Sequence, residues 1–316
     1  MRIHLFPRAI VAAATALAVL LTGCGGADND AAAEGGSIAT NYDLKGATVK
    51  VGSKEFTENL ILGQLAIAVV EAAGGKAEDK TGISGSQTVR AAQESGEIDL
   101  YWDYTGTGWV NILGNEPKNL PEDLFKAVKD ADSKNGITWI GPAPLNNSYG
   151  LAVKKELADE EGIKTMSDLA AYLKKNPKDN KICAASEFLQ RDDGLPGLQK
   201  AYGAKFSVVE LELGLIYSQV GSKCSTGEVL TTDARVASND LVSLQDDKKF
   251  FVPYNGAVTV TSELVKKHPD LVKLFEELAA ALTDEVMMEL NGKVDLDGEK
   301  PRDVARDWLR EKGYIG

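Results

Sequence analysis

The sequence predicts an α/β protein with two lobes and a ligand cleft between them. About 275 residues follow position 41, which is long for one hydrophobic core and sufficient for two. Strand-like and helix-like segments alternate along these residues, a pattern that favours α/β layers. Two segments rich in proline and asparagine, 142–149 and 250–255, each lead into a new strand-like segment. Two such crossings predict two connecting strands and an interlobe cleft, where small ligands commonly bind.

The expected strands are short apolar segments bounded by turn residues. They occupy 47–52, 97–104, 138–140, 150–153, 181–185 and 256–261. The expected helices carry apolar residues near helical spacing, as between Leu60 and Val69, where Gly74 then ends the helix. They occupy 56–73, 86–95, with Ser86 as its N-cap, 120–133, 166–174, 195–202, 270–282, 284–291 and 302–312. These signals place lobe I at 45–147 plus 256–316 and lobe II at 148–255.

The N-terminal residues have the features of a lipoprotein signal peptide. A basic start at Arg2 and Arg8 precedes an apolar run over 9–21, which is too short to span a membrane comfortably. The run ends in Leu-Thr-Gly-Cys, which resembles a bacterial lipobox and predicts cleavage of 1–23 and lipidation of Cys24. The alternative is an ordinary signal peptide with an incidental cysteine.

Residues 24–44 are expected to form a flexible tether behind the lipid. The composition of 25–41 is dominated by Ala, Gly, Asp, Ser and Thr, and it offers too little apolar surface to form a core. No second apolar run is long enough to span a bilayer. We therefore expect a protein that is attached to the extracytoplasmic face of the cell membrane by its lipid anchor only.

Charge and histidine content exclude several classes of function. Removal of Arg2 and Arg8 with the signal peptide changes the formal charge from −12 to −14, which makes nucleic acid a poor partner. The only histidine that remains is His268, which argues against a metal site and against Ser-His-Asp or Cys-His catalysis. The carboxylates show no telling spacing for acid–base chemistry. We therefore expect no enzyme activity, no catalytic residue, no metal and no cofactor.

Two cysteines remain in the folded part, Cys183 and Cys224. Outside the cytoplasm an even pair predicts a disulfide, and the alternative is two separate buried thiols. No Cys-x-x-Cys motif is present, so the pair indicates a structural bridge rather than a redox centre.

The stretch from Tyr101 to Thr107 is the clearest candidate for a binding site. Aromatic residues make up 7% of the chain, yet Tyr101, Trp102 and Tyr104 lie within four positions. The stretch leaves a strand-like segment and enters a glycine turn that is rich in hydroxyl groups. This combination favours a site in which aromatic faces bind a cation and hydroxyl groups bind an anion.

Five motifs follow one another along the chain after the tether. They are Val51-Gly52-Ser53-Lys54-Glu55-Phe56-Thr57-Glu58-Asn59, Asp103-Tyr104-Thr105-Gly106-Thr107, Asn147-Ser148-Tyr149, Phe188-Leu189-Gln190-Arg191-Asp192-Asp193-Gly194 and Thr231-Thr232-Asp233. Together they resemble one family, the substrate-binding proteins of ABC importers for quaternary amines such as glycine betaine, proline betaine, choline or carnitine. The resemblance covers nearly all of the chain after the tether and implies a type II periplasmic-binding-protein fold. It also implies an ABC permease transmembrane subunit as partner, and we expect the protein to be a monomer.

The resemblance implies a role for each site residue. Tyr104, Tyr149 and Tyr254 would form walls of a cage for the trimethylammonium group, which has no N–H to donate and is suited to aromatic faces. A guanidinium, an ammonium and a hydroxyl would bind the ligand carboxylate, and these are Arg191, Lys54 and Thr107. The alternatives are packing roles for the tyrosines, a solvated surface position for Lys54, and pairing of Arg191 with Asp192 or Asp193.

One position departs from the family pattern. Before Thr-Thr-Asp the family usually carries an aromatic residue, whereas this chain has Leu230, which supplies apolar area but no ring quadrupole. Either Trp102 or Tyr217 would then compensate, or the ligand is a different or bulkier zwitterion or quaternary amine. Choline, carnitine and histidine betaine are the candidates beside glycine betaine.

Overall fold

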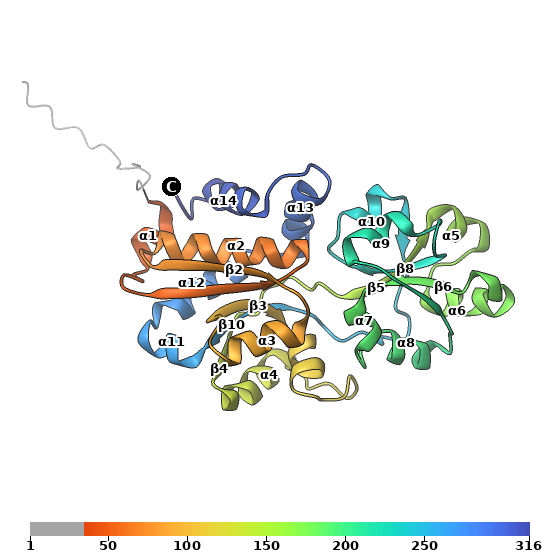
Figure 1. Cartoon of the computed structure of the whole chain (residues 1–316), viewed down its shortest axis with the longest axis horizontal. Coiled ribbons are helices and arrows are strands. Elements are labelled where there is room, and N and C mark those ends of the chain that lie inside the picture. Colours follow the sequence, from red (N-terminus) through yellow and green to blue (C-terminus); the bar gives the residue numbers. More distant parts are fainter. Residues whose placement is uncertain (1–34) are drawn as a thin grey trace, which may run out of the picture. The chain divides into compact units, whose positions relative to one another are not determined.

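The computed structural model describes residues 35–316, which form two β-sheets with helices packed against each. The predicted signal peptide, the lipidation site at Cys24 and the first part of the predicted tether lie outside these residues. In Figure 1 the elements coloured red to yellow, together with the blue ones, surround the first sheet, and the green to cyan elements surround the second. Within residues 35–316, no helix combines the length and apolar character needed to cross a membrane. The predicted α/β class is confirmed.

The first sheet has the strand order β2-β1-β3-β10-β4. β1 runs parallel to β2 and β3, whereas β10 is antiparallel to β3 and β4. Because β10 follows the second sheet in the sequence, the last part of the chain completes a sheet begun by the first part. The strands are β1 (Thr48–Lys54), β2 (Lys76–Ile83), β3 (Leu100–Tyr104), β4 (Ile137–Ile140) and β10 (Gly256–Thr261).

Most of the remaining elements of this half are helices. The long helix α2 packs against β1 and β2 and is itself covered by α14, which leaves most of its apolar side chains buried. The helical elements are α1 (Gly36–Asn41), α2 (Thr57–Ala72), α3 (Ser86–Glu94), the π-helix η1 (Thr107–Ile112), α4 (Leu124–Asp132), η2 (Ser133–Asn135), α11 (Ser262–Lys267), α12 (Asp270–Ala280), α13 (Asp284–Asp295) and α14 (Pro301–Glu311).

The second sheet has the strand order β7-β6-β8-β5-β9. β6 is parallel to β7 and β8, and β5 is antiparallel to β8 and β9. The strands are β5 (Tyr149–Lys154), β6 (Lys181–Ala184), β7 (Ser207–Glu210), β8 (Thr226–Leu230) and β9 (Leu241–Ser243). The helical elements are α5 (Lys155–Glu161), α6 (Met166–Lys175), η3 (Pro177–Asp179), α7 (Ser186–Gln190), α8 (Leu195–Tyr202), α9 (Leu213–Gln219) and α10 (Arg235–Ser238).

The two crossings between the sheets lie side by side. Asn146 and Asn255 form an isolated antiparallel bridge, and the Asn147 N–H donates to the Tyr254 carbonyl at 3.2 Å. The bridge joins the segment that leads into β5 to the segment that leads back into β10. We keep the lobe boundaries of the sequence analysis, 147/148 and 255/256, as a proposal.

The end of the predicted tether differs from the structure. Residues 36–41 form α1, where Ile38 is buried and its N–H donates to the Tyr314 carbonyl at 3.1 Å. Leu44 is also buried in the first core. The expectation of a flexible segment up to residue 44 is therefore wrong for these residues, because two isolated apolar side chains pack against a distant part of the chain.

The strand β2 has no counterpart in the sequence prediction. Its residues are mostly charged or small, and all of them are exposed or half-buried at the edge of the sheet. An edge strand of this kind lacks the apolar run that indicates a buried strand. The strand β2 forms because it pairs with β1, and its local sequence does not indicate this pairing.

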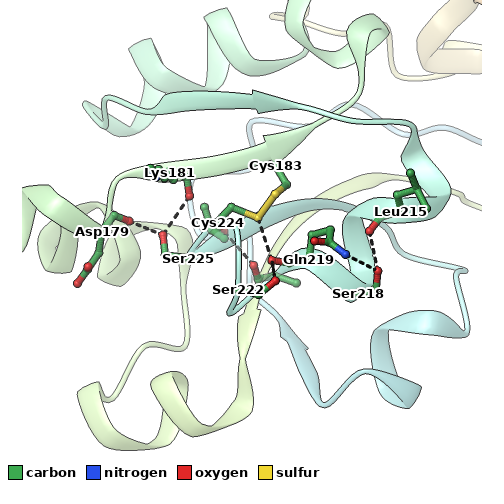
Figure 2. Close-up of a disulfide and its surroundings, with 11 residues drawn as sticks. Asp179, Lys181, Cys183, Leu215, Ser218, Gln219, Ser222, Cys224 and Ser225 are labelled. Carbon is green, nitrogen blue, oxygen red and sulfur yellow. Dashed lines mark hydrogen bonds between the residues drawn. A yellow bond between two sulfur atoms is a disulfide. The ribbon is translucent and has the colours of Figure 1, made fainter.

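Cys183 and Cys224 are joined by a disulfide in the structure (Figure 2). Cys183 lies in β6, and Cys224 lies two residues before β8, which pairs with β6. The Ser225 hydroxyl next to the bridge donates to the Lys181 carbonyl at 3.1 Å (Figure 2). The bridge joins neighbouring strands within the second half of the molecule, and neither cysteine lines the cavity described below.

Candidate ligand-binding site

A cavity of about 1100 Å³ is lined by residues from both halves of the described chain. Its lining includes all of the ligand-binding residues expected from the sequence, which are Lys54, Tyr104, Thr107, Tyr149, Arg191, Leu230 and Tyr254. The expectation that these residues surround one space therefore agrees with the structure, and their contact with a ligand stays a prediction.

Two neighbouring parallel strands bring Lys54 and Asp103 together. Lys54 ends β1, Asp103 lies one residue before the end of β3, and the Lys54 Nζ donates to Asp103 Oδ1 at 2.8 Å. The Tyr101 hydroxyl donates to the other carboxylate oxygen at 2.8 Å. Lys54 is only 4% exposed, so the alternative of a solvated surface lysine is wrong. Its Nζ also lies 5.3 Å from the centroid of the Tyr104 ring.

The turn after β3 needs its glycine for close packing. A Cβ on Gly106 would lie 2.6 Å from the Tyr254 ring, which is closer than side chains tolerate. The missing side chain lets Tyr254 pack directly on the turn that carries Tyr104 and Thr107. This contact explains why the turn has a glycine directly before Thr107.

Two carboxylates bind Arg191, and its side chain also approaches Thr107, which belongs to the half of the chain that contains the first sheet. Its guanidinium binds Asp193 through Nε at 2.8 Å and Nη2 at 2.7 Å, and it binds Glu187 through Nη1 at 2.7 Å. The Nη1 and Nη2 atoms approach Thr107 Oγ1 at 3.5 and 3.4 Å. The alternative pairing with Asp193 is therefore present, yet Arg191 also lines the cavity. Such bidentate pairing fixes the plane of the guanidinium.

The aromatic lining contains one ring that the sequence analysis gave no role. Tyr149 and Tyr254 meet edge to face, with centroids 5.5 Å apart, and the Tyr254 hydroxyl donates to Asp193 Oδ2 at 2.6 Å. Phe56 lines the cavity and stacks on Tyr104 at 6.2 Å. Phe56 lies in the same sequence motif as Lys54. Its closeness to Lys54 in the sequence was the feature that indicated a position in the site.

Leu230 occupies a wall of the cavity beside Tyr149, its register partner on β5. Trp102 is fully buried in the first core, and the Tyr217 hydroxyl accepts the Leu230 N–H at 3.2 Å. Neither Trp102 nor Tyr217 is among the described residues that line the cavity. The expectation that one of them replaces the missing aromatic wall is therefore wrong, because both rings are used in packing.

Glu58 connects Tyr104 to Thr232, which belongs to the half of the chain that contains the second sheet, and it had been given no role of its own within its sequence motif. One carboxylate oxygen accepts from the Tyr104 hydroxyl at 2.7 Å and from Asn147 Nδ2 at 2.8 Å. The other accepts from the Thr232 hydroxyl at 2.6 Å and from Asn291 Nδ2 at 3.3 Å. Burial raises the pKa of Glu58, although all four hydrogen bonds oppose the shift. The carboxyl group thus orients a predicted cage wall through partners that are distant in the sequence.

Glu187 supplies a cap for a helix of the other half. The Ser86 N–H and hydroxyl donate to its two oxygens at 2.9 and 2.6 Å, at the first residue of α3. Ser86 was expected to be the N-cap itself, but Gly85 holds that position. Burial favours the neutral acid, but Lys54, Arg191 and Ser86 outweigh it and lower the pKa of Glu187 to about 2. Glu187 therefore stays ionised between two cations.

Glu228 is a second carboxyl group of the lining that the sequence analysis did not identify. It lies on β8, is 2% exposed, and accepts the Ala185 N–H at 2.7 Å. Burial and the nearby Glu187 raise the pKa of Glu228 to about 8, while the Ala185 N–H and Arg191 act in the opposite direction. The sequence analysis predicted no strand over 226–230, so nothing in the local sequence indicated that this acid is buried.

Comparison with known proteins identifies the family. The model of the substrate binding domain of ABC-type glycine betaine transport systems (OpuAC) matches residues 47–311. A glycine-betaine-binding protein of Pseudomonas aeruginosa is 35% identical over 273 residues, which cover 84% of this chain and 88% of that protein. An ergothioneine transport permease/ergothioneine binding protein, EgtU, of Helicobacter pylori is 35% identical over 266 residues, covering 83% of this chain and 47% of that protein.

A solved structure supports the same assignment. The crystal structure of a glycine betaine/carnitine/choline ABC transporter protein superposes with a TM-score of 0.69 at 28% identity. The match covers 84% of this chain and 99% of that one, and it confirms the type II periplasmic-binding-protein fold. These relatives are solute-binding proteins of transporters rather than enzymes. The chain therefore belongs to the family of substrate-binding domains of ABC-type glycine betaine transport systems.

Proposed function

We propose that this chain is the lipid-anchored, extracytoplasmic receptor of an ABC importer. It binds a zwitterionic quaternary ammonium compound of the glycine betaine type and delivers it to the transmembrane permease. The single observation that carries the proposal is the cavity whose lining unites Lys54, Tyr104, Thr107, Arg191 and Tyr254 with the remaining expected residues.

The chemistry of the lining suits both ends of such a ligand. The rings of Phe56, Tyr104, Tyr149 and Tyr254 offer faces to a trimethylammonium group, and each cation–π contact contributes roughly 0.5–2 kcal/mol when water is excluded. Arg191, close to Thr107, supplies donors for the carboxylate. A ligand held by both groups would contact both halves of the protein, which favours hinge closure around it.

A bulkier ligand is the second candidate. Leu230 leaves more room than an aromatic residue, and the cavity volume of about 1100 Å³ lies just above the usual range for small-molecule sites, roughly 300–1,000 Å³. The relative named for ergothioneine and the solved relative named for carnitine and choline are consistent with this alternative. Choline, carnitine and histidine betaine therefore stay candidates beside glycine betaine.

The position of the protein in the cell is part of the proposal. Lipidation of Cys24 would anchor the chain, and the Cys183–Cys224 disulfide suits an oxidising compartment outside the cytoplasm. Metabolic labelling with a clickable fatty acid should mark the wild-type chain and not Cys24→Ser. Sedimentation of the processed chain should show a monomer.

Calorimetric titration tests the binding function. Glycine betaine, proline betaine, choline, carnitine and histidine betaine are titrated into the wild-type chain and into Leu230→Tyr. If Leu230 makes room for a bulkier ligand, the tyrosine should tighten glycine betaine and weaken that ligand. Absence of heat with every compound in the wild type would contradict the proposal, and unchanged affinities in Leu230→Tyr would show that position 230 is not a wall.

A further inference from the structure

Glu228 and Leu230 point to the same face of the second sheet. They are two residues apart on β8, and side chains at this spacing share one face of a strand. Both line the cavity, and Leu230 pairs in register with Tyr149, a predicted wall of the cage. The carboxyl group of Glu228 therefore lies next to the place where this chain lacks the family's aromatic residue.

The carboxyl group is only partly satisfied by the protein. Oε2 accepts the Ala185 N–H at 2.7 Å, and within residues 35–316 Oε1 has no hydrogen-bond partner. No lysine or arginine of the described chain forms an ion pair with Glu228. A carboxylate that is 98% buried without a cation is costly, because the interior does not replace its hydration.

The charged groups around Glu228 do not supply the missing cation. Arg191, which follows α7, is close enough to act against the rise in the pKa of Glu228, but its guanidinium is already bound by Asp193 and Glu187. Glu187 faces Glu228 from α7 and repels its negative charge, and the Tyr149 hydroxyl faces it from β5. The site is thus complementary to a cation that enters with the ligand.

Building on the proposed function, we propose that the Glu228 carboxylate is an anionic wall of the cage and contacts the quaternary ammonium group where Leu230 supplies no ring. A carboxylate attracts a trimethylammonium group through its charge and needs no N–H from it. The ligand class is therefore any quaternary amine whose ammonium end reaches β8, with the charge itself as the recognised property.

This assignment links binding to proton release. The free protein holds a proton on Glu228 below a pKa of about 8, and a bound cation favours the ionised form. Binding should therefore release a proton at neutral pH, and affinity should rise as the pH increases from about 6 to about 9. A cage built from aromatic and aliphatic walls alone would show no such dependence in this range.

The test distinguishes the effect of charge from the effect of shape, both in the ligand and in the protein. Glycine betaine and choline are titrated together with their uncharged-head carbon isosteres, 3,3-dimethylbutanoate and 3,3-dimethylbutan-1-ol. The variant Glu228→Gln keeps an acceptor for the Ala185 N–H but removes the charge. Glu212→Gln is the matched control, because Glu212 also lines the cavity but is exposed. Titration in two buffers of different ionisation enthalpy measures the proton released.

We expect Glu228→Gln to weaken the quaternary amine at least tenfold at pH about 9, to abolish proton release, and to leave the carbon isosteres within twofold. Glu212→Gln should stay within twofold for all ligands, and Leu230→Tyr should restore affinity in the Glu228→Gln background. Equal affinity of wild type and Glu228→Gln, or binding without proton release in the wild type, would overturn the inference and leave the proposed function standing. If the wild type binds no quaternary amine, the proposed function fails and the inference with it.

Discussion

At the residue scale, the two cations predicted to bind the ligand carboxylate are already paired before any ligand enters. Lys54 is bound by Asp103, and Arg191 is bound by Asp193 and Glu187. This pairing keeps both cations buried and oriented, which a free lysine or arginine in an apolar wall would not be. A ligand carboxylate would then approach donors whose direction is fixed beforehand, and its binding would cost less ordering of side chains.

Replacement of Arg191 by lysine should weaken the binding of ligands that have a carboxylate and leave the affinity for ligands without one nearly unchanged. Lysine keeps the charge but loses the planar fork, and a charge-assisted hydrogen bond contributes roughly 1.5–3 kcal/mol. We therefore expect glycine betaine to bind about 10- to 100-fold more weakly to Arg191→Lys, whereas choline, which has no carboxylate, should change far less. Calorimetry with the two ligands measures both effects.

The control for this variant is Arg90→Lys. Arg90 is equally buried and binds Asp132 through two nitrogens at 2.6 and 2.7 Å, but it does not line the cavity. It should lower the unfolding temperature without a change in affinity. An equal loss of glycine betaine and choline affinity in Arg191→Lys would show that Arg191 acts through structure alone.

At the element scale, the ends of strands and the starts of helices carry the site. Lys54 ends β1, Tyr104 ends β3, Thr107 begins η1 and Leu230 ends β8. Ligands of α/β proteins commonly bind beyond the carboxyl ends of strands, where loops and helix starts converge. The motifs seen in the sequence are therefore turn motifs, and Gly106 shows why their small residues are needed.

The disulfide should stabilise the second sheet without a role in binding. The cysteines are 41 residues apart, and closing a loop of this length contributes up to about 4 kcal/mol in the chain-entropy model. We expect Cys183→Ser combined with Cys224→Ser to lower the free energy of unfolding by about 2–4 kcal/mol, as measured by urea denaturation, with ligand affinity within twofold. An unchanged free energy of unfolding would show that the bridge is not stabilising.

At the scale of the whole molecule, polar contacts connect the two halves across or beside the cavity, in addition to the approach of Arg191 to Thr107. Ser86 binds Glu187, Glu58 binds Thr232, and Arg235 lies 3.3 Å from Asp295. Each contact joins residues that are more than 50 positions apart in the sequence. The affinity for a ligand held by both halves would therefore depend on contacts between the halves as well as on contacts with the ligand.

Acid should weaken the Glu187 contact. The pKa of Glu187 is about 2, below the ordinary value of 4.5, so its stabilising effect is complete above pH 4.5 and is lost as the pH falls towards 2. We expect the unfolding temperature of the wild type to fall more steeply over this interval than that of Glu187→Gln, with the two curves converging near pH 2. Parallel curves would argue that the carboxylate is not held by Ser86 and the neighbouring cations.

Much of the architecture and the cavity lining could be predicted from sequence, and the exceptions have a common cause. The helix at 56–73 was predicted almost to its observed bounds, because a long apolar segment ends at two glycines. By contrast, β2 and α1 lack a local pattern and depend on partners elsewhere in the chain. Leu230 was recognised as a departure from the family, but the acid beside it was overlooked because burial of a single glutamate has no sequence signature.

The sequence by itself determined the family, the α/β class and seven of the residues that line the cavity, because motifs of three to nine residues and local periodicity carry that information. Only the tertiary structure decided which charges are paired, since Lys54 and Asp103 or Glu58 and Thr232 become neighbours through strand order and packing. It also decided that Trp102 and Tyr217 lie outside the cavity and that Glu228 lies within it. Burial and pairing are sums over distant contacts, and no local segment of the chain contains them.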